Sequence, residues 1–175
     1  MNAPEPVVAV VGATGAVGVE IVRCLEQRNF PLSKLKLLAS ARSAGKTMTF
    51  RGETLTVEEL TEQSFDGVNL ALFSAGGSTS RKFAPIAVER GAVVVDNSSA
   101  FRMDDSVPLV VPEINGDAIR SHGGIIANPN CAATISVTPL WPIHRENPIR
   151  RLILSTYQSA SGAGAAAIEE LREST

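Results

Sequence analysis

Short apolar runs recur along the chain, with amphipathic stretches between them. They cover residues 6–12, 35–40, 69–75, 92–98, 108–112 and 124–128. Each run is continuously apolar rather than alternating, which is typical of parallel strands whose two faces are both covered. The pattern therefore predicts an open α/β fold built on a mostly parallel sheet.

The stretches between the first strands carry the spacing of helices. Residues 16–28 place Val17, Ile21 and Leu25 on one face, and residues 79–90 are followed by Gly91, a residue that commonly ends a helix. Strand, helix, strand is the parallel crossover unit. Between residues 47 and 60 the pattern alternates around a glycine, which predicts a small side hairpin.

The last 45 residues follow a different pattern. Residues 131–146 predict a helix disturbed by two prolines, and residues 149–158 predict a strand. Residues 161–175 open a further helix and then stop at Thr175. We expect residues 1–130 to form one domain and residues 131–175 to begin a truncated second α/β domain. We also expect the strand at 152–156 and the helix that begins near Gly164 to leave an open sheet edge and an apolar face, both association-prone.

Composition and charge exclude several classes of protein. The 175 residues are 44% hydrophobic, enough to bury about 70% of the unfolded surface in a core. The 16 basic and 18 acidic residues are interspersed, which offers no basic face to nucleic acid or to an anionic membrane. No apolar run approaches the roughly 20 residues that span a bilayer. Two cysteines and a start unlike a signal peptide predict a cytoplasmic protein.

A glycine-rich loop lies between the first predicted strand and the first predicted helix. The run VAVVGATGAVGVEIV spaces Gly12, Gly15 and Gly18 three residues apart. Glycines permit a tight turn and close backbone approach, and the free N–H groups of the helix terminus then face a pyrophosphate. A purely structural turn is the alternative, but the place between strand and helix favours dinucleotide binding and a Rossmann-like, doubly wound sheet.

The end of the second predicted strand indicates which dinucleotide binds. NAD sites usually carry an acid there for the ribose 2′-hydroxyl, whereas this chain reads LASARSAGK. Ser40, Arg42 and Ser43 offer hydroxyls and a cation, which suit the 2′-phosphate of NADP. A solvated basic loop is the alternative, and NADP(H) is the predicted cofactor.

Cys131 follows the stretch GIIANPN. Pro129 restricts Asn128 to an extended conformation, and the residues after the cysteine can begin a helix. A thiol at a helix N-terminus is favoured as thiolate, the nucleophilic form. The alternative is a small buried hydrophobe, which is the interpretation we prefer for Cys24 within the first helix.

The chain offers this cysteine no evident acid/base partner. If residues 131–146 are helical, His144 lies about 20 Å along the helix from Cys131. His122 precedes the strand whose far end carries Cys131, so we expect it at the opposite edge of the sheet. Neither histidine is a good candidate for the base.

Five motifs in order give the chain a family resemblance. GATGAVG, SARSAGK, DNSSAFR with VPLVVPEIN, ANPNC and TYQSASGAG resemble the N-terminal half of aspartate-semialdehyde dehydrogenase. The resemblance implies a two-domain NADP(H) oxidoreductase, a homodimer or tetramer when complete, that acts in lysine, methionine and threonine biosynthesis. It implies reductive dephosphorylation of L-aspartyl 4-phosphate to L-aspartate 4-semialdehyde through a Cys131 thioester, with small-molecule substrate and phosphate as partners and no metal.

The resemblance also assigns roles to single residues. It implies that Thr14, Gly15, Ala16 and Val17 line the cofactor phosphates, that Arg42 and Ser43 bind the 2′-phosphate side, and that Ser161 and Gly162 contact the cofactor near the nicotinamide. Gly12 and Ser40 join this set through the glycine loop and the end of the second predicted strand. Arg102 matches the phosphate-binding arginine, with Asn130 close by, and Gln158 matches the substrate-orienting glutamine. Without the resemblance, Arg102 is a surface arginine and Gln158 a polar strand-end residue. The family's acid/base histidine and substrate-carboxylate arginine belong to a stretch that this sequence does not contain.

Three other functions remain as alternatives. N-acetyl-glutamyl-phosphate reductase shares the chemistry, but the NPNC setting argues against it. Short-chain reductases need Tyr-x-x-x-Lys, whereas Ser161 stands four residues after Tyr157. The third alternative is an NADP-binding fragment or sensor that binds the cofactor without turnover.

Overall fold

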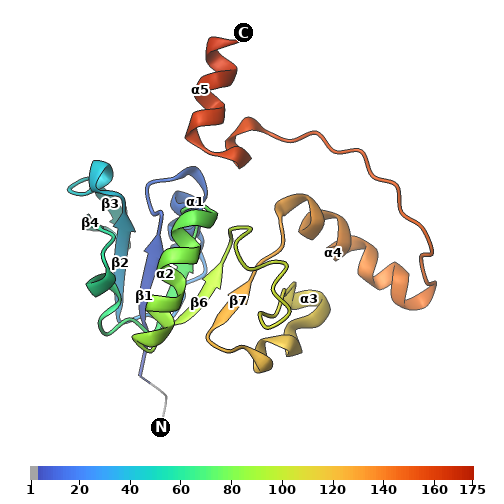
Figure 1. Cartoon of the computed structure of the whole chain (residues 1–175), viewed down its shortest axis with the longest axis horizontal. Helices are drawn as coiled ribbons and strands as arrows, with labels where there is room; N and C mark the ends of the chain where they lie inside the picture. The colour runs from blue at the N-terminus through green and yellow to red at the C-terminus, as the bar shows by residue number, and fades with distance from the viewer. Residues whose placement is uncertain (1–3) are drawn as a thin grey trace.

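The computed structural model describes residues 4–175 and contains one seven-stranded sheet (Figure 1). The strands are β1 Val7–Val11, β2 Lys34–Ala39, β3 Thr47–Phe50, β4 Glu53–Glu59, β5 Leu70–Phe73, β6 Val93–Asp96 and β7 Ile125–Ala127. Their order is β3-β4-β2-β1-β5-β6-β7, and every neighbouring pair is parallel except β3 with β4. The predicted Rossmann-like, mostly parallel α/β sheet is confirmed.

Helices flank this sheet and continue beyond its last strand. They are α1 Ala16–Gln27, α2 Gly77–Glu89, α3 Pro112–Asn115, α4 Cys131–Glu146 and α5 Ala165–Glu173, with short 3-10 turns at Ala41–Ser43, Glu62–Phe65, Gly116–Ser121 and Ala160–Ala163. The helices α1 and α2 cover opposite faces of the sheet (Figure 1). Within residues 4–175, no helix combines the length and the apolar character needed to cross a membrane.

Alternate side chains of the central strands divide the core into two clusters. Val8 and Val10 of β1 pack with Val22 of α1 on one face, while Val11 and Ala84 of α2 belong to the other. Successive residues of a strand point to opposite faces, so one continuously apolar strand serves both clusters. The continuous apolar runs in the sequence have this origin.

The buried stripe of α1 differs from the predicted one. Gly18, Val22 and Leu25 are buried, whereas Val17 is 39% exposed. Positions 18, 22 and 25 stay on one line of a 3.6-residue helix, while a repeat of four drifts around it. The prediction that Cys24 is buried is also wrong, because this cysteine lies on the exposed side of α1.

The predicted side hairpin is present and belongs to the main sheet. Arg51 and Gly52 both have positive φ angles, 51° and 80°, as a tight two-residue hairpin turn requires. The second strand of the hairpin, β4, also pairs in parallel with β2, with Val57 opposite Leu37. The hairpin therefore extends the sheet by two strands.

The predicted strand at 108–112 is reduced to a single bridge. Leu109 pairs with Ala127, and the Val110 N–H donates to the Ala127 carbonyl oxygen at 2.9 Å. Pro108 has no N–H to donate, and Pro112 already begins α3. Too few residues remain between the two prolines to form a strand.

The C-terminal 45 residues contain two helices and an extended segment. The helix predicted at 131–146 is confirmed as α4, although none of its residues is buried. Residues 151–159 are all exposed and form no strand; the segment arches away from the sheet (Figure 1). The strand prediction at 149–158 is wrong for the described chain, because a strand forms only beside a neighbour that accepts its backbone hydrogen bonds.

Candidate active site at the carboxyl ends of the strands

The glycine-rich loop after β1 is shaped by two close backbone approaches. Gly12 has a φ of 84°, and a β-carbon there would lie within 3.0 Å of the Ser74 carbonyl oxygen after β5. A β-carbon on Gly18 would meet the Gly12 carbonyl equally closely. Gly15 is the N-cap of α1, in extended conformation. Only glycine fits positions 12 and 18, so the loop brings the α1 N-terminus directly over β1.

A cleft of about 660 Å³ opens above this loop. The predicted phosphate-binding residues Thr14, Gly15, Ala16 and Val17 all line it. Its other walls come from the loops after β5 and β6 and from the C-terminal segment: Ser74, Ala75, Gly76, Gly77, Asn97, Ser98, Ser99, Arg102, Ser161, Gly162, Gly164 and Ile168. The cleft lies where the chain leaves β1 and β5 toward opposite faces of the sheet, the place where open α/β sheets bind ligands.

The three residues predicted to bind a 2′-phosphate lie at the end of β2, outside the lining of this cleft. Ser40 and Arg42 are exposed, and Ser43 is 7% exposed. Their loop adjoins the glycine loop, because the N–H groups of Gly12 and Ala13 both donate to the Leu38 carbonyl. Ser40 and Arg42 are therefore open to a ligand at the rim, whereas Ser43 is mostly covered by protein.

Arg102 lies between the carboxyl ends of β6 and β7 and is half-buried. Its Nε donates to the Asn128 carbonyl oxygen at 2.8 Å, and its Nη2 donates to the Asn97 carbonyl oxygen at 3.0 Å. The Asn128 side-chain amide donates to Asn97 Oδ1 at 2.6 Å. Arg102 is thus fixed at the wall of the cleft rather than free on the surface.

Cys131 is the first residue of α4 and is exposed. Asn130 caps this helix, because its Oδ1 accepts the Ala133 N–H at 2.7 Å. A second cleft of about 440 Å³ is lined by Cys131 together with Gln158, Ser161 and Gly162. Ser161 and Gly162 also line the larger cleft, so the cleft at Cys131 and the cleft above the glycine loop adjoin at these two residues.

Comparison with known proteins identifies the family. Residues 7–122 match the family described as semialdehyde dehydrogenase, NAD binding domain. The chain belongs to the semialdehyde dehydrogenase family. It is 56% identical over 170 residues to aspartate-semialdehyde dehydrogenase of Synechocystis, an alignment that covers 97% of this chain and 50% of that protein. The chain thus spans about half the length of the curated relatives it matches.

Two solved structures of aspartate semialdehyde dehydrogenases have the same fold as this chain. The crystal structure of aspartate semialdehyde dehydrogenase II complexed with ASA from Vibrio cholerae is 48% identical, with a TM-score of 0.92 over 98% of this chain and 52% of that one. The Candida albicans enzyme with NADP is 27% identical, with a TM-score of 0.68 over 82% of this chain and 48% of that one.

Both histidines of the chain form hydrogen bonds with backbone groups other than those of Cys131. His122 Nδ1 accepts the Gly124 N–H at 3.0 Å, before β7 begins. His144 Nδ1 accepts the Ile149 N–H at 3.1 Å, and its ring stacks on Trp141 in the last turns of α4. Across residues 4–175, histidines, cysteines and carboxylates form no group of three or more suited to a metal ion.

Several polar residues near the cleft carry contacts that sequence reasoning did not assign. Asp96 is fully buried at the end of β6, and Asn97 and Asn128 join the ends of β6 and β7. They stand in the motifs DNSSAFR and ANPNC, directly after apolar runs. This position in the sequence could have marked them as site residues, because polar residues at the carboxyl end of a parallel strand lie on the ligand-binding side of the sheet.

Proposed function

We propose that the complete protein catalyses the NADPH-dependent reductive dephosphorylation of L-aspartyl 4-phosphate to L-aspartate 4-semialdehyde. The observation that carries the proposal is that two adjoining clefts, one at Cys131 and one above the glycine loop, have Ser161 and Gly162 in common as lining. Family membership and the relatives named aspartate-semialdehyde dehydrogenase support the same activity.

The residues of the larger cleft fit a dinucleotide. Positions 12 and 18 would be blocked by any β-carbon, so the backbone there is shaped for close packing beneath the α1 N-terminus. Thr14, Gly15 and Ala16 would hold the cofactor phosphates, and exposed Arg42 would pair with the 2′-phosphate of NADP. A family relative solved with NADP supports this choice. When bound, the reduced nicotinamide supplies the hydride that takes the Cys131 thioester to the aldehyde level.

Cys131 would perform the acyl transfer. Its thiolate attacks the carbonyl carbon of the acyl phosphate, a C–S bond forms, and the C–O bond to phosphate breaks as phosphate leaves with the electron pair. Cys131 stands at the exposed start of α4 and lines the cleft, so its sulfur is open to the substrate. After reduction, collapse of the thiohemiacetal returns the thiolate and releases the semialdehyde.

Two other side chains would orient the substrate. Arg102 would bind the phosphate group, since its planar guanidinium carries five N–H donors and two of them suffice for the Asn97 and Asn128 carbonyls. Gln158 lines the Cys131 cleft and would orient the acyl group, with Asn130 holding the start of α4.

We further propose the organisation of the complete protein. Residues 1–130 form the NADP-binding domain and residues 131–175 begin a catalytic and dimerisation domain, because β7 ends at Ala127 and the sheet gains no strand after it. The complete protein would be a homodimer or tetramer that acts in lysine, methionine and threonine biosynthesis. An NADP-binding fragment without turnover is the alternative for the 175 residues alone, because they span half the relatives' length.

The proposal is tested by phosphate-dependent reduction of NADP with L-aspartate semialdehyde, run beside Cys131→Ala and an NADPH titration. We expect any turnover to be lost in the variant, while NADPH binding remains. Turnover that survives Cys131→Ala would contradict the proposal. NADPH binding without turnover would favour the binding-fragment alternative for these residues.

A further inference from the structure

The loop after β6, residues 97–102, is held at its beginning by a carboxylate that does not reach the cleft. Asp96 is 0% exposed. Its Oδ1 accepts the Ser80 hydroxyl of α2 at 2.7 Å and the Ser98 N–H at 3.1 Å, and its Oδ2 accepts the Ser98 hydroxyl at 2.7 Å. Buried charges are costly unless several donors satisfy them, so this arrangement fixes α2 and the loop rigidly to β6.

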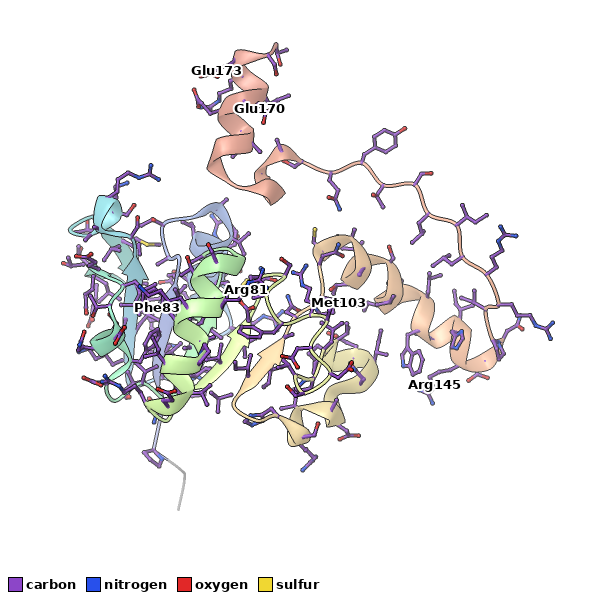
Figure 2. All side chains as sticks on the ribbon, in the orientation of Figure 1. Arg81, Phe83, Met103, Arg145, Glu170 and Glu173 are labelled. Atoms are coloured by element: carbon purple, nitrogen blue, oxygen red, sulfur yellow. The ribbon has the colours of Figure 1, made fainter. Side chains whose placement is uncertain are left out.

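The hydrogen bonding continues from Asp96 along the loop. Ser98 Oγ, which donates to Asp96, accepts the Ala100 N–H at 3.0 Å. From α2, Arg81 Nη1 donates to the Ala100 carbonyl oxygen at 3.1 Å, and Figure 2 shows Arg81 beside the loop. The path of the backbone from Asn97 to Ala100 is therefore set before the chain reaches Arg102.

The end of the same loop is tied to the segment that carries Cys131. Arg102 bonds to the carbonyls of Asn97 and Asn128, and Asn128 stands three residues before Cys131. The Asn128 N–H also donates to the Asp96 carbonyl oxygen at 2.9 Å. The position of the Arg102 guanidinium relative to Cys131 thus depends on the loop that Asp96 anchors.

We propose that Asp96 is a positioning residue, which sets the Arg102 guanidinium for phosphate through Ser98 and the 97–102 loop. This inference rests on the proposed function, in which Arg102 binds the phosphate group beside Cys131. Because the Asp96 side chain is sealed from the cleft, any effect of changing it on phosphate binding must pass through the loop.

The test measures how inorganic phosphate slows alkylation of Cys131 by iodoacetamide, with peptide mass spectrometry as the readout. Exposed Cys24 in the same chain serves as the internal reference. We expect Asp96→Asn to raise the half-protecting phosphate concentration about tenfold, the loss typical of one hydrogen bond to a charged group. Asp105→Asn, the same change at an exposed position in the turn that follows Arg102, should leave the half-protecting phosphate concentration within about twofold of the parent value.

A double-variant cycle separates positioning from general destabilisation. In an Arg102→Lys background the guanidinium is already lost, so Asp96→Asn should add less than about a twofold effect on phosphate protection. A role in stability alone would lower the melting temperature by the same amount in both backgrounds and leave phosphate protection unchanged. Ser98→Ala removes one of the three hydrogen bonds to the Asp96 carboxylate and should also raise the half-protecting phosphate concentration. This second variant keeps the test decisive if Asp96→Asn does not fold.

The outcomes distinguish this inference from the proposed function. The positioning role alone would be overturned by one pattern of results. In that pattern the half-protecting phosphate concentration stays within about twofold of the parent value in Asp96→Asn and Ser98→Ala, while protection is lost in Arg102→Ala. Protection that persists in Arg102→Ala would overturn the phosphate role of Arg102 and this inference with it.

Discussion

Gly18 of α1 lies against the Gly12 carbonyl so closely that a β-carbon at position 18 would come within 3.0 Å of that oxygen. The contact sets the distance between helix and sheet at the point where the α1 N-terminus faces the cleft. A single methyl group at this position must therefore move the helix, the loop or both.

We expect Gly18→Ala to lower the free energy of unfolding by about 1–3 kcal/mol, the usual cost of overpacking. NADPH binding should weaken as well, because the displaced loop lines the cleft. Gly123→Ala is the matched control, since its β-carbon meets open space and should change stability by less than about 0.5 kcal/mol. Urea denaturation measures the free energy of unfolding of both variants. Equal values for Gly18→Ala and Gly123→Ala would contradict a close contact between Gly18 and the Gly12 carbonyl.

The two cysteines should differ in function although both are exposed. Cys131→Ser should abolish phosphate-dependent NADP reduction, because a serine hydroxyl is a far weaker nucleophile than a thiolate at neutral pH. Cys24→Ser, on the outer side of α1, should retain the parent activity and the parent melting temperature. A loss of activity in Cys24→Ser, or its survival in Cys131→Ser, would place the nucleophile elsewhere.

Arg42 should determine the preference for NADPH over NADH. We expect Arg42→Ala to weaken NADPH binding about tenfold, because one charge-assisted contact to the 2′-phosphate is lost, and to leave NADH binding unchanged. Lys46→Ala provides a control for overall charge, since Lys46 is an exposed cation on the same loop. Fluorescence titration with both cofactors measures the effect. An equal loss for NADPH and NADH would refute a contact with the 2′-phosphate.

The stability of the turn after Arg102 should depend on the titration of the Asp104 carboxyl, whose pKa is lowered. The hydroxyl and then the N–H of Ser106 donate to Asp104 and lower the pKa of its carboxyl from 3.8. A depressed pKa means that the turn is stabilised above pH 3.8, and that this contribution is lost as pH falls through the folded-state pKa. Carboxyl NMR titration should show Asp104 below 3.8, with Ser106→Ala moving it back toward that value; an unchanged titration would exclude the hydroxyl as the cause.

The extended segment after α4 should promote association. Ile153 is 79% exposed and Tyr157 is 102% exposed, on backbone that pairs with no strand in the described chain. Unpaired backbone and exposed apolar side chains favour pairing with another copy. Light scattering at tens of micromolar should therefore show association of the 175 residues, reduced by Ile153→Lys. A stable monomer would contradict the prediction.

Most of the sheet could be predicted from the sequence because continuous apolar runs are a local signal. Five runs became β1, β2, β5, β6 and β7, and of these β1, β2 and β5 contribute side chains to both clusters of the core. The bridge at Leu109 and the extended segment around Ile153 could not be predicted in this way. Their apolar patterns resemble strands, and only the presence of a partner with free backbone groups decides whether a strand forms.

The site was predictable where one loop defines it and less so where several loops meet. Thr14 to Val17 line the cleft, their contact with the cofactor phosphates stays a prediction, and Cys131 begins a helix as predicted. The hydrogen bonds that join Asp96 to Ser80 span two elements, and those from Arg102 to Asn128 span 26 residues. Contacts of that range depend on the packing of the sheet, for which a single sequence gives no spacing rule.

The most direct test of the proposed function is to incubate the protein with L-aspartyl 4-phosphate in the absence of cofactor and to analyse its peptides by mass spectrometry. The account predicts one aspartyl group on the Cys131 peptide, released by hydroxylamine as a thioester should be, and none in Cys131→Ala. An acyl group that remains in Cys131→Ala, or that is found on the Cys24 peptide instead, would contradict it.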